Sequence, residues 1–189
     1  MGAEKKKKSI ATKKGDKGET SLLDGTRTRK SSDRPEVYGT MDEAQAFVGV
    51  ARARSDSPRV TAILLEIQND IYMVNSELAC PAESLHLLKR TIESRDVERL
   101  TRHVTAIEKE LDLPPRFVLY GELETSALLD VARAVVRRAE RALTRLEESE
   151  TIENQNIKAF VNRLSDLLFV LARLEEREAG VPLRHPETP

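Results

Sequence analysis

The sequence has no tryptophan, a single cysteine among 189 residues, and almost no net charge. One cysteine, Cys80, excludes an intrachain disulfide and a metal site built from several cysteines. Aromatic residues make up 4% of the chain and the formal net charge is −1, which argues against base stacking and general nucleic-acid binding. No apolar run approaches the roughly 18 residues of a membrane helix. We therefore expect a cytoplasmic protein with neither nucleic acid nor membrane as a partner.

Composition divides the chain into four parts, and its length suits one domain with its own core. The lysine-rich residues 1–11 are typical of a disordered tail. Residues 12–39 are polar and rich in glycine, and such a long loop is uncommon unless it is functional or disordered. Residues 40–178 carry helical periodicity. Residues 179–189, which contain Gly180 and Pro182, are expected to form a flexible tail.

Apolar residues recur with the helical period in five stretches, which predicts an all-α, five-helix bundle with no strand. The first helix is expected to begin at Thr40 with a capping box. Ser57 is expected to cap the second helix, with Pro58 at its first position. The expected helices cover residues 40–54, 57–79, 95–111, 124–148 and 153–178, with residues 82–93 ambiguous.

The helix expected over residues 124–148 combines an apolar stripe with a face rich in arginine. At about 100° per residue, Arg133, Arg137 and Glu140 lie together on the side away from the stripe. This face fits a solvated surface, but the planar guanidinium also suits polyphosphate. Both interpretations stay open on the residues alone. The expected core stripe comprises Leu128, Val131, Ala132, Val135, Ala139, Ala142, Leu143 and Leu146.

The last expected helix, residues 153–178, repeats this layout. Its polar face contains an aromatic residue, Phe169, which a purely solvated face does not need. The other Arg and Glu residues of this helix and of residues 95–111 are expected to be mostly solvated. The polar face comprises Asn162, Asp166, Phe169 and Arg173, and the core stripe comprises Ile157, Phe160, Val161, Leu164, Leu168 and Leu171.

The loop before the first helix has features of a ligand-binding loop. Gly15 and Gly18 permit positive φ and close approach of a ligand to the backbone. The lysines and hydroxyls around them suit phosphate. Composition alone nonetheless favours a flexible leader, and Cys80 fits a small packed residue. Glu83 and His86 have the Glu-x-x-His spacing of a di-iron site, but such a site needs two copies and only one is present.

Five stretches together resemble the PduO-type ATP:cob(I)alamin adenosyltransferases. They occur in the order typical of that family, over about residues 12–175, and their combination is far more specific than a glycine loop alone. The family usually has Thr at the position of Lys14, Pro-Gly-Gly at 120–122 and Thr-Val-Cys at 134–136. The matching stretches are residues 15–22, 38–43, 67–70, 132–141 and 162–169.

The resemblance implies transfer of the 5′-deoxyadenosyl group of ATP to cob(I)alamin, giving adenosylcobalamin and triphosphate, with Mg²⁺. It implies a ferritin-like five-helix bundle that assembles as a homotrimer with active sites between subunits. Delivery of product to a B12-dependent mutase or dehydratase is implied as well. The alternatives are a non-catalytic ATP- or corrinoid-binding relative that delivers or senses cofactor, and a structural helical protein, which would leave the glycine loop unexplained.

The resemblance also assigns residues. Asp42 and Arg133 would pair across the subunit interface and, with Arg137 and Glu140, form the catalytic set. Phe117 and Phe169 would bind the corrinoid. No protein cluster would hold a metal by itself, since Mg²⁺ would arrive with ATP and Glu140 is its candidate ligand. The residues assigned to ATP are Thr12, Lys13, Lys14, Gly15, Thr20, Ser21, Lys30, Arg137, Arg138, Glu140, Arg141 and Asn162.

The residue chemistry agrees with this assignment. Because cob(I)alamin is itself the nucleophile, the reaction needs no activated Ser or Cys. The protein must instead hold the reactants in line and stabilise a triphosphate leaving group, which calls for positioning and cations. The arginine face and the lysine-containing glycine loop would supply both.

Overall fold

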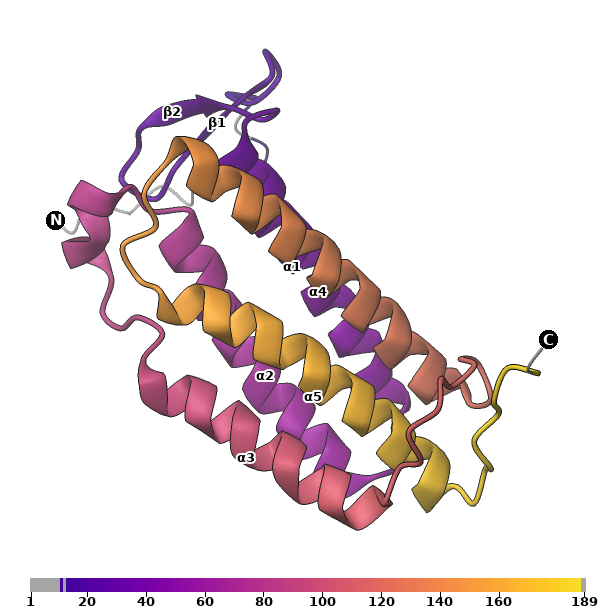
Figure 1. Ribbon diagram of the computed structural model, residues 1–189. Coiled ribbons are helices and arrows are strands. Elements are labelled where there is room, and N and C mark those ends of the chain that lie inside the picture. The colour runs from indigo at the N-terminus through magenta and orange to yellow at the C-terminus, as the bar shows by residue number, and fades with distance from the viewer. Residues whose placement is uncertain (1–10, 12, 188–189) are drawn as a thin grey trace, which may run out of the picture.

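The computed structural model describes residue 11 and residues 13–187, so most of the expected basic tail and the assigned residue Thr12 lie outside it. Within this part the chain forms a bundle of five α-helices, which confirms the all-α prediction (Figure 1). None of the described helices is apolar over a length that spans a bilayer. The elements are β1 (Glu19–Ser21), β2 (Arg27–Arg29), α1 (Asp33–Arg54), α2 (Pro58–Leu78), the 3-10 helix η1 (Ala82–Leu87), α3 (Ser94–Leu111), α4 (Glu124–Ser149) and α5 (Asn156–Glu178).

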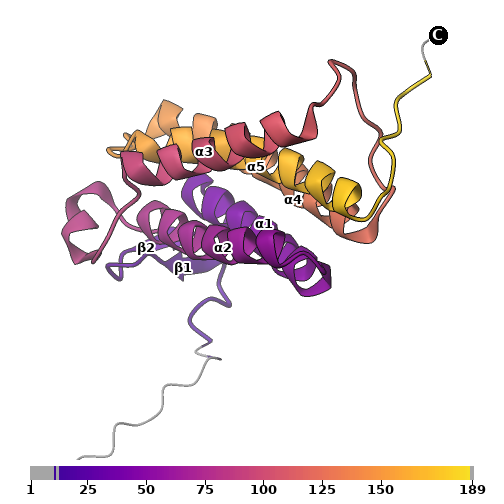
Figure 2. The ribbon, with the colours of Figure 1, turned by 90° about the horizontal axis from the view of Figure 1, so that it is seen from below.

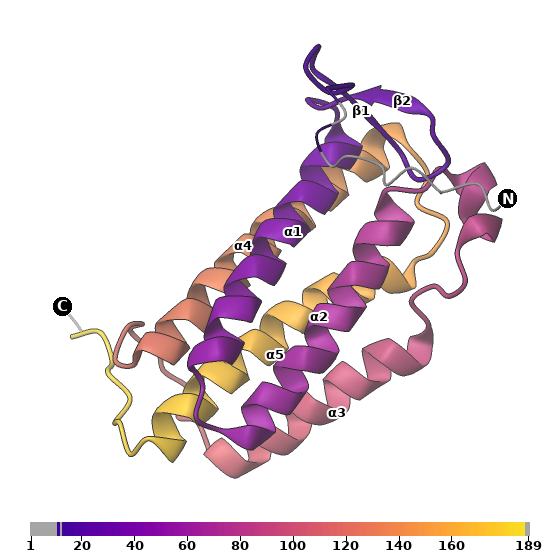
Figure 3. The ribbon, with the colours of Figure 1, turned by 180° about the vertical axis from the view of Figure 1, so that it is seen from behind.

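The helices lie in two layers, with α1 and α2 in one and α3, α4 and α5 in the other (Figure 2). α1 packs along α4, and α5 lies between α3 and α4 (Figure 1 and Figure 3). The apolar faces of the two layers meet to form one core, which is the usual way for amphipathic helices to bury their stripes. The fully buried side chains include Met41, Leu64, Ile67, Leu143 and Phe160.

The expectation that the chain contains no strand is wrong. β1 and β2 pair as an antiparallel hairpin, with Thr20 opposite Thr28. The connecting turn contains Gly25 at φ +94°, a conformation that favours glycine. Each strand has three residues, too few for an alternating pattern to stand out from a polar loop.

The first helix begins seven residues before the expected capping box, at Asp33 with Ser32 as N-cap, rather than at Thr40. Pro35 lies in the first turn, where its missing N–H costs nothing, so it does not mark a loop. Thr40 is inside the helix and its hydroxyl donates to the carbonyl oxygen of Glu36 at 2.7 Å. The Ser57 cap is confirmed, since its Oγ accepts from the N–H of Val60 at 3.3 Å.

The faces of α4 and α5 differ from those expected in two places. Val131, expected in the core, is 42% exposed, whereas Val136 is fully buried. Arg173, expected on the polar face of α5, is fully buried, and Glu175 and Glu176 beside it are buried too. α4 and α5 each contact helices on more than one side, so the buried arc is wider than a single stripe and includes charged residues.

Charged side chains are also buried between α2 and α3, where a solvated face was expected. Asp70 of α2 accepts a hydrogen bond from Arg99 of α3 at 2.5 Å. Asp96 lies in the same cluster and accepts from Arg90 at 2.6 Å. Burial raises the pKa of Asp70 to about 6, because lost hydration outweighs the attraction of Arg99.

We expect Asp70→Asn to remove a pH dependence of stability. A carboxyl with a raised pKa binds its proton more tightly in the folded state than in the unfolded state. The contribution of protonated Asp70 to the free energy of unfolding is therefore fully present below pH 3.8 and is lost as the pH rises through about 6. Relative to wild type, the free energy of unfolding of Asp70→Asn should therefore rise by about 1–3 kcal/mol from about pH 4 to about pH 7. Urea denaturation at both pH values measures the change. Asn69→Ser, at the neighbouring exposed residue of α2, changes no titratable group, so it is the control and should show no rise. Parallel profiles for Asp70→Asn and wild type would contradict the expectation.

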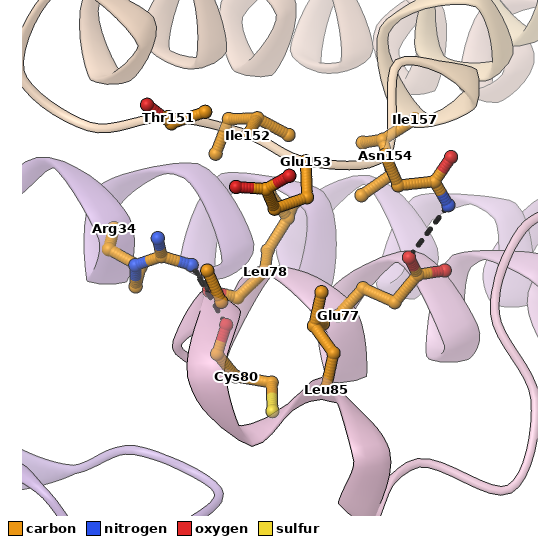
Figure 4. Close-up of a pocket in the computed structure, with 11 residues that line it drawn as sticks. Arg34, Glu77, Leu78, Cys80, Leu85, Thr151, Ile152, Glu153, Asn154 and Ile157 are labelled. Carbon is orange, nitrogen blue, oxygen red and sulfur yellow. Dashed lines mark hydrogen bonds between the residues drawn. The ribbon is translucent and has the colours of Figure 1, made fainter.

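Arg34 joins three segments at the hairpin end of the bundle, and Figure 4 shows its side chain beside Leu78 and Cys80. Its Nη1 donates to the carbonyl oxygens of Leu78 and Cys80 at 2.8 and 3.2 Å. Its Nε and Nη2 donate to Glu150 at 2.9 and 2.5 Å. Cys80 is buried, as its expected packing role requires. The start of α1, the end of α2 and the end of α4 are thus held together by one guanidinium.

Arg34→Met should lower the free energy of unfolding by about 2–4 kcal/mol, because two carbonyl oxygens in a buried setting lose their donor. Guanidinium chloride denaturation of both proteins gives the difference. Arg54→Met is the matched control, since that side chain is 62% exposed and its ion pair with Glu124 spans 3.7 Å. The control should change the free energy of unfolding by less than about 1 kcal/mol. Equal losses in the two variants would show that the buried hydrogen bonds of Arg34 stabilise the fold no more than an exposed ion pair does.

Candidate functional site

The loop expected to bind ATP folds against the end of β2. The N–H of Lys30 donates to the carbonyl oxygen of Gly18 at 2.9 Å, and the N–H of Gly18 donates to that of Gly15 at 3.2 Å. A Cβ atom at Gly15 would lie 3.2 Å from Nζ of Lys30, so glycine lets the ammonium approach the backbone here. The structure therefore brings the glycine loop and Lys30 together, which suits a bound phosphate.

Arg27 of β2, which was not among the expected site residues, fastens the two sides of this loop. Its Nη1 donates to Oγ of Ser21 at 3.1 Å, and its Nη2 donates to the carbonyl oxygen of Lys14 at 2.9 Å and to Glu19 at 3.2 Å. Ser21 is the acceptor in this bond, so its own hydroxyl proton stays available to a ligand oxygen. Arg27 thus orients one of the residues assigned to ATP.

The hairpin is docked on the bundle by its turn and by β1. The N–H of Leu23 donates to the carbonyl oxygen of Ala79 at 2.8 Å, and Oγ of Ser84 donates to Asp24 at 3.1 Å. Thr20 hydrogen bonds with Tyr38 of α1, and burial raises the pKa of the Tyr38 hydroxyl above its ordinary value of 10.0. The end of α2, to which Arg34 donates, lies at the same end of the bundle as the hairpin (Figure 1). The loop therefore rests on a fixed base.

A second feature is an open groove of about 520 Å³, bounded by α3, α4, α5 and the segment between α3 and α4. Phe117 and Phe169, the two residues assigned to the corrinoid, both line it. Arg133 and Arg137 of α4 line it as well. Phe117 is 88% exposed, so no other part of the described subunit covers its ring. The groove combines apolar rings with cations, as an apolar ligand with a charged co-substrate would require.

Arg133 is held from two directions within its own subunit. Its Nε donates to Oδ1 of Asp130 at 3.2 Å, one turn earlier on α4. Its guanidinium lies 4.9 Å from the centre of the Tyr120 ring and 6.0 Å from that of Phe169. Both rings are within the range of a cation–π contact. Arg133 is therefore a half-buried cation with a fixed orientation.

Behind Arg133 lies a buried ion network that connects α4 and α5. Arg173 donates from Nη2 to Oδ2 of Asp130 at 2.7 Å and to Glu176 at 2.9 Å. Asp130 thus accepts from Arg133 with one oxygen and from Arg173 with the other. The Tyr120 ring covers both guanidiniums, at 4.9 Å from Arg133 and 5.6 Å from Arg173.

The remaining assigned residues lie along α1, α4 and α5. Nδ2 of Asn162 donates to Glu140 at 2.9 Å, so these two are brought together. Arg138 forms an ion pair with Glu43 of its own subunit. Asp42, Arg137 and Arg141 are exposed, and Asp42 lies on α1 rather than beside Arg133. In residue 11 and residues 13–187, no three His, Cys, Asp or Glu side chains group as metal ligands would.

The segment between α3 and α4, which carries Phe117 and Tyr120, is held by residues that follow α5. The N–H of Leu119 donates to the carbonyl oxygen of Arg184 at 2.8 Å. Nδ1 of His185 lies 2.8 Å from the carbonyl oxygen of Phe117, and Nε of Arg184 lies 2.7 Å from Glu122. Both sides of Tyr120 are therefore fastened to the last described residues.

A single subunit does not bring the two halves of the expected site together. The hairpin lies at one end of the bundle and the segment between α3 and α4 lies at the other (Figure 1). Arg137 is three helical turns, roughly 18 Å, before the end of α4 near the hairpin. Sequence reasoning missed Asp130, Tyr120 and Arg27, since an acid within a helix and a lone loop tyrosine carry no motif. The only signal was that residues 120–122 depart from the family pattern.

Comparisons with known proteins give a consistent result. A family model described as Cobalamin adenosyltransferase matches residues 10–175. The chain is 37% identical over 172 residues to a cobalamin adenosyltransferase of Cupriavidus metallidurans, covering 90% of each chain. It is 39% identical over 176 residues to a corrinoid adenosyltransferase of Bacillus subtilis, covering 91% of this chain and 89% of the relative.

A solved structure shares the fold. It is a variant of the PduO-type ATP:corrinoid adenosyltransferase of Lactobacillus reuteri, complexed with cobalamin and ATP. The TM-score is 0.89 at 28% identity, and the match covers 95% of this chain and 100% of the other. The sequence match over most of the chain and the shared bundle agree, and the chain belongs to the PduO-type ATP:corrinoid adenosyltransferase family.

Proposed function

We propose that the chain transfers the adenosyl group of ATP to cob(I)alamin, with the corrinoid in the groove of Phe117 and Phe169. The observation that carries this proposal is the groove itself, where two aromatic rings and the two arginines Arg133 and Arg137 meet. Apolar rings suit the face of a corrin ring, and they keep water away from the metal it carries. The cations suit the triphosphate that must leave. The Lactobacillus reuteri relative, complexed with cobalamin and ATP, supports this pairing of ligands.

ATP is proposed to bind to the glycine loop of one subunit and to the α4 and α5 residues of a neighbour. The loop offers Lys13, Lys14, Lys30 and backbone N–H groups, and Asn162 and Glu140 form a hydrogen-bonded pair on the other side. Mg²⁺ bound with phosphates keeps several waters and takes only one or two carboxylates. Glu140 fits that need as a single carboxylate, and no larger metal cluster is required.

Assembly as a homotrimer is supported by an exposed stripe, apolar except for Asp42, that nothing in the described subunit covers. On α1, Asp42, Ala46 and Val50 recur at four-residue spacing, and all three are exposed. On α4, which packs along α1, Val131 and Ala134 are exposed as well. Val50 and Val131 are 46% and 42% exposed on these adjacent helices, and contiguous exposed apolar residues are typical of an interaction surface. A neighbouring subunit on this stripe would bring Asp42 close to Arg133 of another chain.

The chemistry then follows from positioning. Cobalt attacks C5′ of ATP, the C5′–O bond breaks, and triphosphate leaves with the bonding electrons. Arg137, exposed in the groove, is proposed to bind the triphosphate and to stabilise its growing charge. Product adenosylcobalamin would pass to a B12-dependent mutase or dehydratase. An anaerobic assay with ATP, Mg²⁺ and reduced cobalamin, followed by the spectral change to adenosylcobalamin, tests the activity and separates it from cofactor binding alone.

Arg137→Lys is the sharper test of the proposed leaving-group role, because lysine keeps the charge and loses the planar fork. We expect turnover to fall by about 100-fold or more, as for loss of a preorganised donor, with the assembly unchanged. Steady-state kinetics of the anaerobic assay measure this. Arg145→Lys, at an exposed position further along α4, serves as the control and should match wild type. Wild-type turnover with an unchanged KM for ATP would show that Arg137 does not act on the triphosphate.

The proposed contact between Asp42 and Arg133 makes a separate prediction. If the pair is buried between subunits, removing either partner destabilises the assembly by about 3–5 kcal/mol. The losses of the two single variants then do not add in the double variant. Asp42→Asn and Arg133→Met should each reduce activity, and the double variant should be little worse than either single variant. Sedimentation equilibrium is the accompanying measurement and should give a trimer for wild type. Strict additivity counts against the contact, and a monomer at micromolar concentration overturns the shared site.

A further inference from the structure

We infer that Tyr120 and Asp130 are positioning residues that fix the orientation of Arg133 before a neighbouring subunit or a ligand meets it. This inference rests on the proposed role of Arg133. Its basis is that the two residues hold different parts of one guanidinium. Asp130 accepts from Nε at 3.2 Å, and the Tyr120 ring faces the guanidinium carbon at 4.9 Å.

Because Nε and the face of the Arg133 guanidinium are occupied, its two terminal nitrogens remain available to bind a partner. Within the described residues, its hydrogen bond uses Nε alone, and the aromatic contacts use the face of the guanidinium. The two terminal nitrogens form the edge that pairs best with a carboxylate or phosphate in bidentate geometry. Holding the face and Nε therefore presents this edge to an incoming partner, with little side-chain freedom left to lose.

Asp130 can do this because it is itself fixed. Its second oxygen accepts from Arg173, which is fully buried and bound to Glu176. The Asp130 side chain is only 4% exposed. A carboxylate shared by two arginines neither rotates nor leaves without breaking both bonds. Arg173 thus acts at one remove, by fixing the acceptor of Arg133.

The backbone around Tyr120 also limits where its ring can lie. Gly121 has φ +105°, so the backbone turns directly after the tyrosine. The neighbouring residues Leu119 and Glu122 are bound to Arg184, which limits movement of the segment. The ring is therefore kept over Arg133 by the backbone as well as by the cation–π contact.

Tyr120→Leu tests the role of the ring without disturbing the core, because Tyr120 is 53% exposed. We expect kcat to fall about fivefold to tenfold, within the range of a cation–π contact, with the KM for ATP unchanged. Tyr120→Phe keeps the ring and should stay within about twofold of wild type. Leu119→Ala, at the adjacent exposed residue outside the groove, is the matched control and should leave kcat unchanged. Equal losses in Tyr120→Leu and Tyr120→Phe would overturn the inference.

A double variant separates positioning from a structural effect. Arg133→Lys keeps a charge, so turnover stays measurable, but it lacks Nε and the planar face. If Tyr120 acts through Arg133, adding Tyr120→Leu to Arg133→Lys should cost less than about twofold more. Multiplying losses would overturn the inference. If Arg133→Lys itself matches wild type, the proposed role of Arg133 fails and the inference fails with it.

Asp130→Asn supplies an independent measurement, because asparagine still accepts a hydrogen bond but carries no charge. Its kcat loss should also shrink to less than about twofold when Arg133→Lys is present. Urea denaturation of the same proteins reports any loss of stability from removing one of the two carboxylates that bind Arg173. If Asp130→Asn lowers kcat by the same factor in the Arg133→Lys background as in wild type, Asp130 stabilises the fold and does not act through Arg133. The Tyr120 variants decide the inference if Asp130→Asn does not fold.

Discussion

The ion pair between Arg173 of α5 and Asp130 of α4 is the contact on which the site depends. Taking both charges out of water is costly, and it is tolerated only because each finds a second partner, Glu176 for Arg173 and Arg133 for Asp130. An apolar pair of the same volume would hold the helices at least as well. It would not fix the rotation of α4 against α5, which sets where Arg133 and Phe169 point.

Most of the fold was predictable because it follows from apolar periodicity. Ser57, Pro58 and the apolar runs set the positions of α2, α4 and α5 to within a few residues. The start of α1 was wrong because Pro35 is ambiguous, being a loop marker in a sequence and harmless in a first helical turn. The hairpin was missed because strands of three residues carry no period.

Sequence motifs pointed to candidate site residues that the fold brings together, but not to the buried charges behind them. The glycine loop with Lys30, and the pair of Asn162 and Glu140, lie together as the resemblance implied. Arg173 was predicted on the wrong face of α5, because charged residues on a helical wheel are taken to face solvent, whereas this side chain is buried. Contacts between subunits are outside the reach of both the wheel and a single chain, so the partner of Asp42 stays a proposal.

The residues after α5 hold one side of the groove in place. Through Arg184 and His185 they are hydrogen bonded to the segment that carries Phe117, at the mouth of the groove. An affinity tag or fluorescent protein fused directly after these residues would lie beside those hydrogen bonds. The activity of such a fusion protein should therefore be compared with that of a protein tagged ahead of the hairpin. The position of a tag is therefore a variable to control in activity measurements on this chain.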